Sequence, residues 1–290
     1  MTTIALATCA DQATLFHDEA PLVTALEQRG FEVFITIWNS PEIDWYSYDR
    51  VLIRNTWDYH NQAQVFMQWL DHLDQQGVPV VNPTALVRWN MNKRYLHALA
   101  QEGIHTLPTR FVAGDTVTLA EVLAQEGWAQ AVTKPVIGGS EDHIQVITPD
   151  SALAYQQEFE WLNSSIGMMV QAFAPQIQRE GEYSLVFYRG VYSHAVLKQA
   201  ADGSIFVHEE RGGRIARITP PPSLIAQAKN VIDTAHRLTG ILPVYARVDG
   251  VRDGEQLVLM ELECIKPELY FSRYAHASQG LVTALIDAST

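Results

Sequence analysis

Two strand-like segments near the end of the chain carry charged residues at alternate positions. Arg247 and Asp249 lie in the first segment and Glu261 and Glu263 in the second, with an Asp-Gly turn between them. Because successive strand residues point to opposite faces, each pair shares one face of its strand. A two-residue turn would put the two pairs on opposite faces of the hairpin. A three-residue loop, 253–255, instead pairs Arg247 with Glu261 and sets Asp249 diagonal to Glu261. The pattern predicts a hairpin with all four charges on one face.

Three carboxylates and one guanidinium on an otherwise apolar hairpin suit a bound ion better than a core. Mg²⁺ takes a few carboxylates and fills its octahedral shell with phosphate oxygens. The hairpin therefore favours a site for Mg²⁺ and a polyphosphate. Three close carboxylates repel one another, so this face is expected to be under electrostatic strain without metal. The alternative is a solvated face with an Arg247–Glu261 ion pair.

Composition limits the class of partner. The 290 residues are enough for one large domain or two to three subdomains. A net charge of −13 argues against a nucleic-acid partner, which needs a basic surface. An acidic protein that binds a polyphosphate must concentrate positive charge locally, so isolated lysines in apolar segments are candidate ligands.

Two further features bear on the compartment. No apolar run approaches the roughly 18 residues of a membrane span, and the start lacks the basic region of a signal peptide. Cys9 and Cys264 lie far apart and suggest neither a metal motif nor a disulfide framework. These features predict a cytoplasmic protein with reduced thiols and no membrane partner.

The first 85 residues alternate strands and helices, which is typical of a parallel sheet covered by helices. The expected strands are 3–7, 31–38, 50–53 and 78–81, and the expected helices are 18–29 and 61–76. Ligands of such sheets bind beyond the carboxyl ends of the strands. Arg54 and Asp58 follow the third strand, so segment 54–59 is expected to form a wall of the substrate site. The alternative is a helix cap with packing.

The remainder of the chain is predicted to form one helix and two units that contain both helices and strands. A helix is expected from Thr84 to Glu102, and residues 107–168 form a small α+β unit. A strand at 168–174 then opens a β-rich part, 169–290. Its other expected elements are strands 182–188, 192–198 and 205–209, the hairpin, and helices 223–238 and 277–288.

Two lysines meet the criterion of isolation in apolar segments. Lys134 ends a buried strand and precedes Gly138, Gly139 and Ser140, whose backbone N–H groups can approach an anion closely. The lysine precedes the glycines, so this is not a P-loop, and a surface hairpin is the alternative. Lys93 is expected on the buried face of its helix, where a lysine either reaches to water or meets an anion.

A connector and the strand after it offer groups for a nucleoside. The backbone of Gln171-Ala172-Phe173 can read an adenine edge, with the Phe173 ring against the base. Glu182 begins a strand and can accept both ribose hydroxyls. The alternatives are a core position for Phe173 and a solvated strand end for Glu182.

The order of these motifs along the whole chain resembles the ATP-grasp superfamily, the fold of D-alanine–D-alanine ligase, glutathione synthetase and RimK-type ligases. Residues 1–85 match its Rossmann-like N-terminal domain, and 86–290 its ATP-grasp domain, with a lid at 107–168 and a C-terminal subdomain at 169–290. Segments 52–59, 87–93 and 261–267 look like the O-ureidoserine cyclo-ligase of cycloserine biosynthesis. The implied fold class is α/β and α+β.

The resemblance implies a role for each motif. Lys93 and Lys134 would hold ATP phosphates beneath the loop Gly138–Ser140, while Gln171, Ala172 and Phe173 would form the adenine hinge and Glu182 would bind the ribose. The hairpin carboxylates would hold Mg²⁺, and Arg247 would stabilise charge on an acyl phosphate. Substrate contacts would come from residues outside these motifs, namely Arg54, Asp58, Lys198, Arg211 and Gly212.

One departure concerns Glu263, since many ATP-grasp enzymes have asparagine there. The extra carboxylate either strengthens metal binding or turns toward Arg247. The resemblance implies a ligase that uses ATP and Mg²⁺ to activate a small-molecule carboxylate or acyl group for attack by nitrogen. The rivals are a phosphotransferase and a non-catalytic nucleotide-binding protein. The acceptor, the nucleophile and the oligomeric state, including a homodimer, are left open.

Overall fold

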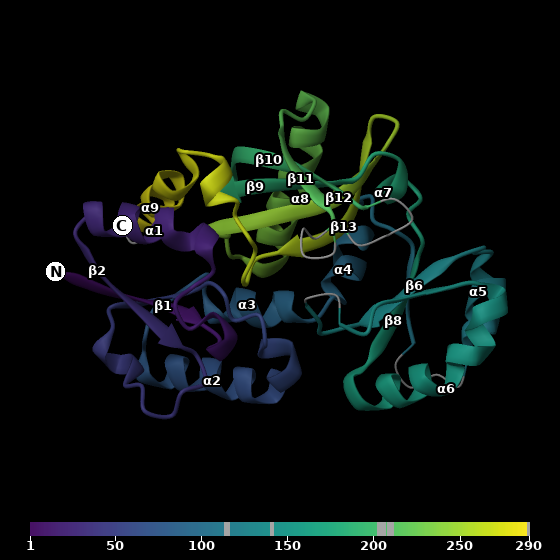
Figure 1. The fold of residues 1–290 in the computed structure, drawn as a ribbon, viewed down its shortest axis with the longest axis horizontal. Helices are drawn as coiled ribbons and strands as arrows, with labels where there is room; N and C mark the ends of the chain where they lie inside the picture. The colour runs from purple at the N-terminus through teal and green to yellow at the C-terminus, as the bar shows by residue number, and fades with distance from the viewer. Residues whose placement is uncertain (113–116, 140–141, 202–206, 208–211, 289–290) are drawn as a thin grey trace.

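The computed structural model describes residues 1–112, 117–139, 142–201, 207 and 212–288, and these residues form three sheets (Figure 1). The first sheet is parallel, with strand order β2-β1-β3-β4. Its strands are β1 (Thr2–Thr8), β2 (Phe31–Ile37), β3 (Arg50–Ile53) and β4 (Val80–Val81). The connecting helices are α1 (Ala20–Gln28) and α2 (Ala63–Gln76), which confirms the predicted strand–helix alternation.

The second sheet is antiparallel and has the order β11-β10-β9-β12-β13. Its strands are β9 (Glu182–Tyr188), β10 (Val191–Gln199), β11 (Arg214–Ile218), β12 (Tyr245–Asp253) and β13 (Gln256–Glu263). Helix α8 (Pro222–Thr239) packs on one face of it. β11 was not predicted, and the strand expected at 205–209 lies, apart from Val207, outside the described residues.

The third sheet has the order β5-β8-β6-β7. Its strands are β5 (Thr109–Phe111), β6 (Ala131–Pro135), β7 (Gln145–Ile147) and β8 (Met168–Ala172), and its helices are α5 (Leu119–Glu126) and α6 (Pro149–Ile166). The strand expected to open the β-rich part is β8, and it pairs here with β5 and β6 instead. The domain boundaries themselves stay a prediction.

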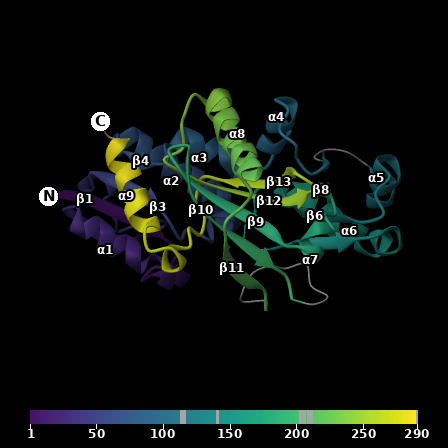
Figure 2. The same ribbon diagram turned by 90° about the horizontal axis from the view of Figure 1, so that it is seen from above.

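The remaining elements are short or terminal. Helix α7 covers Gln176–Arg179, and the 3-10 helices among the described residues cover Ala10–Gln12, His17–Glu19, Trp45–Ser47, Tyr59–Gln62 and Phe271–Arg273. Helix α9 (Ala277–Asp287) lies beside α1 and so packs against the first sheet unit (Figures 1 and 2). No helix in the described ranges is long and apolar enough to cross a bilayer.

The helix expected from Thr84 to Glu102 is interrupted. α3 covers Thr84–Met91 and α4 covers Tyr95–Gln101, with Asn92 extended between them. The backbone N–H of Lys93 donates to the Val136 carbonyl at 2.8 Å, a bond that continued α-helix would forbid. Lys93 therefore lies in a connection beside the end of β6 rather than on a helix face.

The hairpin β12–β13 has a different register from the predicted one. Asp253 pairs with Gln256 across a two-residue turn, yet Arg247 faces Glu263 and Asp249 faces Glu261. A bulge restores the parity, because Gly250 pairs with Leu259 and leaves one residue of β13 unmatched. A Cβ at Gly250 would lie 2.6 Å from a backbone oxygen of β13, so the close approach requires glycine. The predicted pairing was wrong, but the predicted common face is confirmed.

Candidate active site

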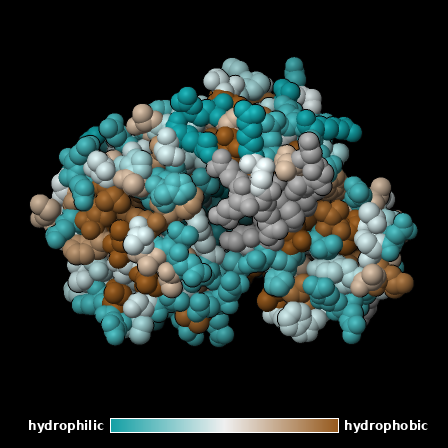
Figure 3. All heavy atoms as spheres, in the orientation of Figure 1, coloured by the Kyte–Doolittle hydropathy of each residue, from teal (hydrophilic) through white to brown (hydrophobic). Residues whose placement is uncertain are grey.

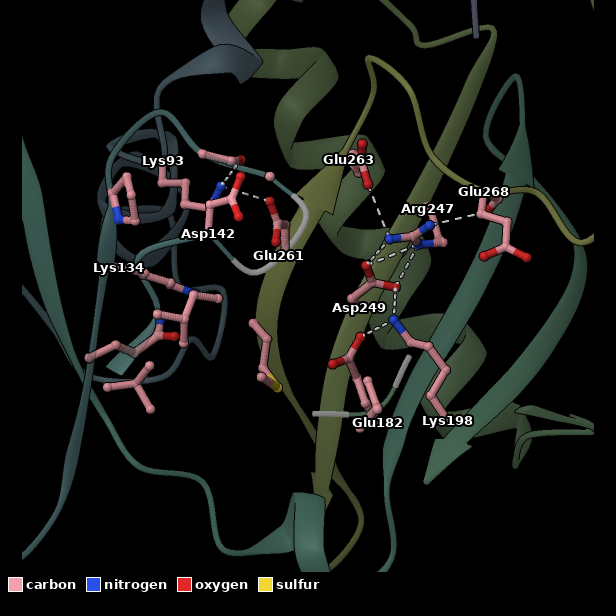
Figure 4. Close-up of a pocket in the computed structure, with 18 of the residues that line it drawn as sticks. Lys93, Lys134, Asp142, Glu182, Lys198, Arg247, Asp249, Glu261, Glu263 and Glu268 are labelled. Carbon is pink, nitrogen blue, oxygen red and sulfur yellow. Dashed lines mark hydrogen bonds and ion pairs between the residues drawn. The ribbon is translucent and has the colours of Figure 1, made fainter. Parts of the chain in front are cut away.

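A cavity of about 420 Å³ lies where the three sheets meet, a volume typical of small-molecule sites. Figure 3 shows the lower edge of the molecule notched between the part that carries α2 and the part that carries α6. The walls of the cavity come from all three sheet units. Trp57 and Tyr59 follow β3. Lys134 lies near the end of β6, and Arg247 and Glu261 lie on the hairpin (Figure 4).

The two isolated lysines converge on one side of this cavity. Lys93 is 7% exposed, and its Nζ donates to the Gly138 carbonyl at 3.0 Å and lies 3.1 Å from Glu261 Oε1. Lys134 is equally buried. Burial lowers its pKa to about 8, against the opposing pull of Glu261. The connection between α3 and α4 and the end of β6 thus each put one ammonium group beside the glycine loop.

Arg247 organises the opposite part of the hairpin face. Its Nε and Nη2 donate to the Asp249 carboxylate at 2.8–3.0 Å, and Nη2 also donates to Glu263 Oε2 at 3.1 Å. Its Nη1 donates to the Glu268 carbonyl at 3.1 Å. Glu263 has therefore turned toward Arg247, one of the two predicted arrangements. Arg247 pairs with Asp249 and Glu263 rather than with Glu261, the partner that the alternative interpretation gave it.

The expected electrostatic strain on this face is not found. Burial acts to raise the pKa of Asp249, but the charges of Arg247 and Lys198 outweigh it and lower that pKa to about 2. Burial also acts to raise the pKa of Glu261, but the charges of Lys93 and Lys134 outweigh this effect and lower that pKa. The strain prediction was wrong because cations from β10, β12 and the lysine segments neutralise the carboxylates.

The carboxylates remain candidates for a cation despite this pairing. Within the described ranges no three His, Cys, Asp or Glu residues are arranged around one metal position. Asp249 and Glu261 nevertheless face each other across the hairpin and both line the cavity. Mg²⁺ is commonly held by one or two carboxylates with phosphate oxygens completing its shell, so this donor set fits it.

The other end of the cavity is mainly apolar. It is lined by the hinge Gln171–Phe173 together with Leu107, Val132, Ala174, Ile177 and Met260. The Gln171 side chain donates to Thr109 Oγ1 at 2.9 Å, which holds the hinge against β5. Glu182 lines the same end and forms an ion pair with Lys198 (Figure 4). The predicted hinge, ribose carboxylate and Lys198 thus reach one cavity.

Two predicted substrate residues do not reach the cavity. Arg54 is fully buried and donates to both oxygens of Glu19 at 3.0 and 2.6 Å and to the Pro267 carbonyl at 2.9 Å. Asp58 accepts from Trp38 Nε1 at 2.7 Å. The expectation of direct substrate contact is contradicted for Arg54, which has no exposed surface, and is not supported for Asp58, a half-buried residue outside the cavity lining. Their neighbours Trp57 and Tyr59 do line the cavity.

Other predicted positions have mixed outcomes. Gly138 and Gly139 line the cavity, whereas Gly212 is exposed outside its lining. Ser140 and Arg211 lie outside the described residues. Lys266 was missed, although it is an isolated lysine in an apolar segment by the criterion that selected Lys93. It is 9% exposed, and its Nζ lies 3.7 Å from Glu263 Oε1.

Comparison with known proteins defines the class first. Residues 4–82 match the family described as the N-terminal domain of D-cycloserine synthetase DcsG. The crystal structure of D-cycloserine synthetase DcsG superposes with a TM-score of 0.91 at 25% identity, covering 99% of this chain and 100% of that one. D-alanine–D-alanine ligase from Bacillus anthracis gives a TM-score of 0.70 at 14% identity, covering 100% and 97%. The chain has the ATP-grasp fold and is similar to ATP-dependent ligases that share it.

The similarity in sequence points to one kind of ligase within this fold. Over 276 residues the chain is 29% identical to the cycloserine biosynthesis protein DcsG of Streptomyces lavendulae, covering 92% of each protein. The RimK domain protein of Sphaerobacter thermophilus is a more distant relative in structure, with a TM-score of 0.69 at 20% identity, covering 97% of this chain and 98% of that one. The predicted fold and the predicted resemblance to the cycloserine ligases are both confirmed.

Proposed function

We propose that this protein activates a small-molecule carboxylate or acyl group as an acyl phosphate, using Mg²⁺ with ATP, and joins it to nitrogen. One observation carries the proposal: a single cavity combines an apolar end, a glycine loop with two lysines, and a hairpin face with an arginine. Curated and solved relatives are named for cycloserine synthesis, which favours ring closure by an intramolecular nitrogen over ligation of two molecules.

ATP is proposed to lie along the cavity, with its base in the apolar end and its phosphates near the lysines. The adenine would pack in the hinge and the ribose would meet Glu182. The phosphates would lie between Lys93, Lys134 and the glycine loop, where burial strengthens electrostatic attraction. At Gly139 a Cβ would lie 3.1 Å from Lys266 Nζ, so the lack of a side chain lets the loop lie close to this cation.

Mg²⁺ is proposed to bind at Asp249 and Glu261, with Glu263 in the position of the usual amide. When bound, the ion supplies charge neutralisation and a template for the phosphates. The chain supplies the carboxylates on rigid strands and the cations that keep them ionised. Because Lys93 contacts Glu261 directly, it would serve both the metal carboxylate and the phosphates.

The reaction would proceed in two balanced steps. An acceptor carboxylate oxygen attacks the γ-phosphorus of ATP, forming acyl phosphate and releasing ADP. A nitrogen then attacks the acyl carbon, phosphate leaves, and the nitrogen loses a proton. Arg247 would stabilise the charge on the transferred group and on the tetrahedral intermediate. The unit at 107–168 would act as a lid that keeps water from the acyl phosphate.

A screen for ADP release over small carboxylic acids, amino acids and O-ureidoserine tests this function. At least one acceptor is expected to raise ADP release well above the rate with Mg-ATP alone. Hydroxylamine added during turnover is expected to give a hydroxamate, because it traps an acyl phosphate. ADP release with a phosphorylated product and no hydroxamate would assign a phosphotransferase instead, and binding of ATP without any turnover would assign a non-catalytic protein.

The pKa of Lys134 gives a pH dependence for nucleotide binding. In the free protein its pKa is about 8, because burial disfavours the charged form. Phosphate contact favours the ammonium, so above pH 8 binding must take up a proton and ATP affinity should fall, by up to about tenfold per pH unit. Titration calorimetry in EDTA, in buffers of different ionisation enthalpy, measures this uptake. Lys134→Arg keeps its charge and should remove the dependence. An affinity that is flat from pH 7 to 9 in the parent protein would contradict the assignment.

A further inference from the structure

The segment after the hairpin, Ile265–Ser272, has two different sides. Lys266, Glu268 and Tyr270 line the cavity, while Leu269 and Phe271 are buried in a core shared with the first sheet. The segment contains no regular strand pairing, and Tyr270 has a left-handed backbone with φ of 54°. A cavity wall built from such a segment depends on anchors outside it for its position.

Those anchors are buried and come from other parts of the chain. The Tyr245 hydroxyl lies 2.8 Å from the Ile265 carbonyl, and the Asp18 carboxylate accepts from the Phe271 and Ser272 N–H groups at 2.8 Å. Arg54 holds the middle of the segment through the Pro267 carbonyl. Its guanidinium lies over the rings of Tyr245 and Phe271, 5.5 and 5.8 Å from their centroids.

Two arginines therefore donate hydrogen bonds to neighbouring carbonyls of the same segment. Arg54 donates to the Pro267 oxygen, and Arg247 donates to the Glu268 oxygen at 3.1 Å (Figure 4). Arg54 is itself oriented by its two bonds to Glu19, and burial makes that pair a fixed support rather than a solvated one. A shift of the Pro267 carbonyl would move the Glu268 carbonyl, and with it the Arg247 guanidinium.

We infer that Arg54 is a positioning residue, which acts through the Pro267–Glu268 backbone to place Arg247 for catalysis. The inference rests on the proposed function, because it takes Arg247 as the catalytic group. It assigns a role to the buried Arg54–Glu19 pair, which touches no part of the cavity. A buried ion pair is weak evidence of stabilisation, so a role in geometry accounts for it better than stability alone.

The test is Arg54→Lys, compared with Arg50→Lys as a matched control. Lysine keeps the charge but cannot hold both Glu19 and the Pro267 carbonyl in the forked geometry. Arg50 is the first residue of β3, the strand that Arg54 follows, and it also donates to a distant carbonyl, that of Leu285 at 3.2 Å, away from the cavity. With the acceptor selected by the ADP-release screen, Arg54→Lys should lower kcat on the order of 10²-fold, with Kd for ATP within about twofold of the parent value. Arg50→Lys should change neither.

Hydrogen exchange supplies a readout that stability alone would not move. The backbone amides of residues 266 and 268–270 should exchange faster in Arg54→Lys than in Arg50→Lys, at a temperature where both are folded. If Arg54→Lys does not fold, Glu19→Gln, which keeps the guanidinium of Arg54, is compared with Arg50→Lys in the same measurements. An unchanged kcat despite faster exchange, or a fall in ATP affinity equal to the fall in kcat, would overturn the positioning role. Full activity in Arg247→Lys would remove Arg247 from the proposed mechanism, and this inference would fail with it. Full activity in Arg54→Lys beside an impaired Arg247→Lys would overturn this inference alone.

Discussion

Arg247→Lys is expected to lower kcat on the order of 10²- to 10³-fold while leaving Kd for ATP close to that of the parent protein. Lysine keeps the positive charge but loses the fork that contacts Asp249, Glu263 and the Glu268 carbonyl together. Loss of one donor that stabilises transition-state charge costs about 2.7–4 kcal/mol in comparable sites. Steady-state ADP release and nucleotide titration measure the two quantities separately.

A second variant controls for loss of structure in that experiment. Arg252→Lys changes a half-exposed arginine of the same strand, whose guanidinium lies 2.8 Å from Glu180 Oε1. Exposed pairs of this kind contribute little, so its kcat and thermal stability should stay near the parent values. Equal losses of turnover in both variants would assign Arg247 a role in the fold of β12 alone. Unchanged turnover in Arg247→Lys would remove the arginine from the mechanism.

Glu261→Gln is expected to abolish the extra heat stability that Mg-ATP confers over ATP with EDTA. The parent protein should be stabilised more by Mg-ATP, since a ligand at 100 times its Kd adds about 2.7 kcal/mol. Glu261 lies between Asp249 across the hairpin and Lys93, so its charge is at the centre of the proposed metal site. Differential scanning fluorimetry with each nucleotide form measures the difference in Tm.

Glu263→Asn serves as the companion variant for the metal site. This variant keeps Asp249 and Glu261, and asparagine restores the side chain usual in the superfamily. The difference in Tm between Mg-ATP and ATP with EDTA should therefore persist. Stabilisation by Mg-ATP that survives in Glu261→Gln would place the ion elsewhere. Loss of the difference in Glu263→Asn with retention in Glu261→Gln would exchange the roles of the two carboxylates.

Local patterns in the sequence determined the main elements and several parts of the site. Strand–helix alternation was enough to predict the parallel sheet, because helices and strands have different side-chain periods. The isolation of Lys93 and Lys134 in apolar segments was enough to select them, because a buried ammonium needs an anion. Alternating charges were enough to predict a common hairpin face. Each of these inferences uses residues only a few positions apart.

Tertiary structure decided the details that depend on distant partners. The bulge at Gly250 corrected the hairpin register without changing the shared face. The break beside Lys93 follows from a backbone bond to Val136, 43 residues further along the chain by number. β8 joined the third sheet because its partners β5 and β6 lie there, although its own sequence suits either sheet equally.

Arg54 shows the physical limit most clearly. A polar residue at the carboxyl end of a parallel strand is a fair candidate for ligand contact, and the sequence carries no sign that Glu19 and the Pro267 carbonyl would meet it inside the protein. The sequence by itself determined which groups have to leave water or find a charge partner. Only the tertiary structure decided which partner each one found, because burial and pairing energies depend on segments that come together in the folded chain.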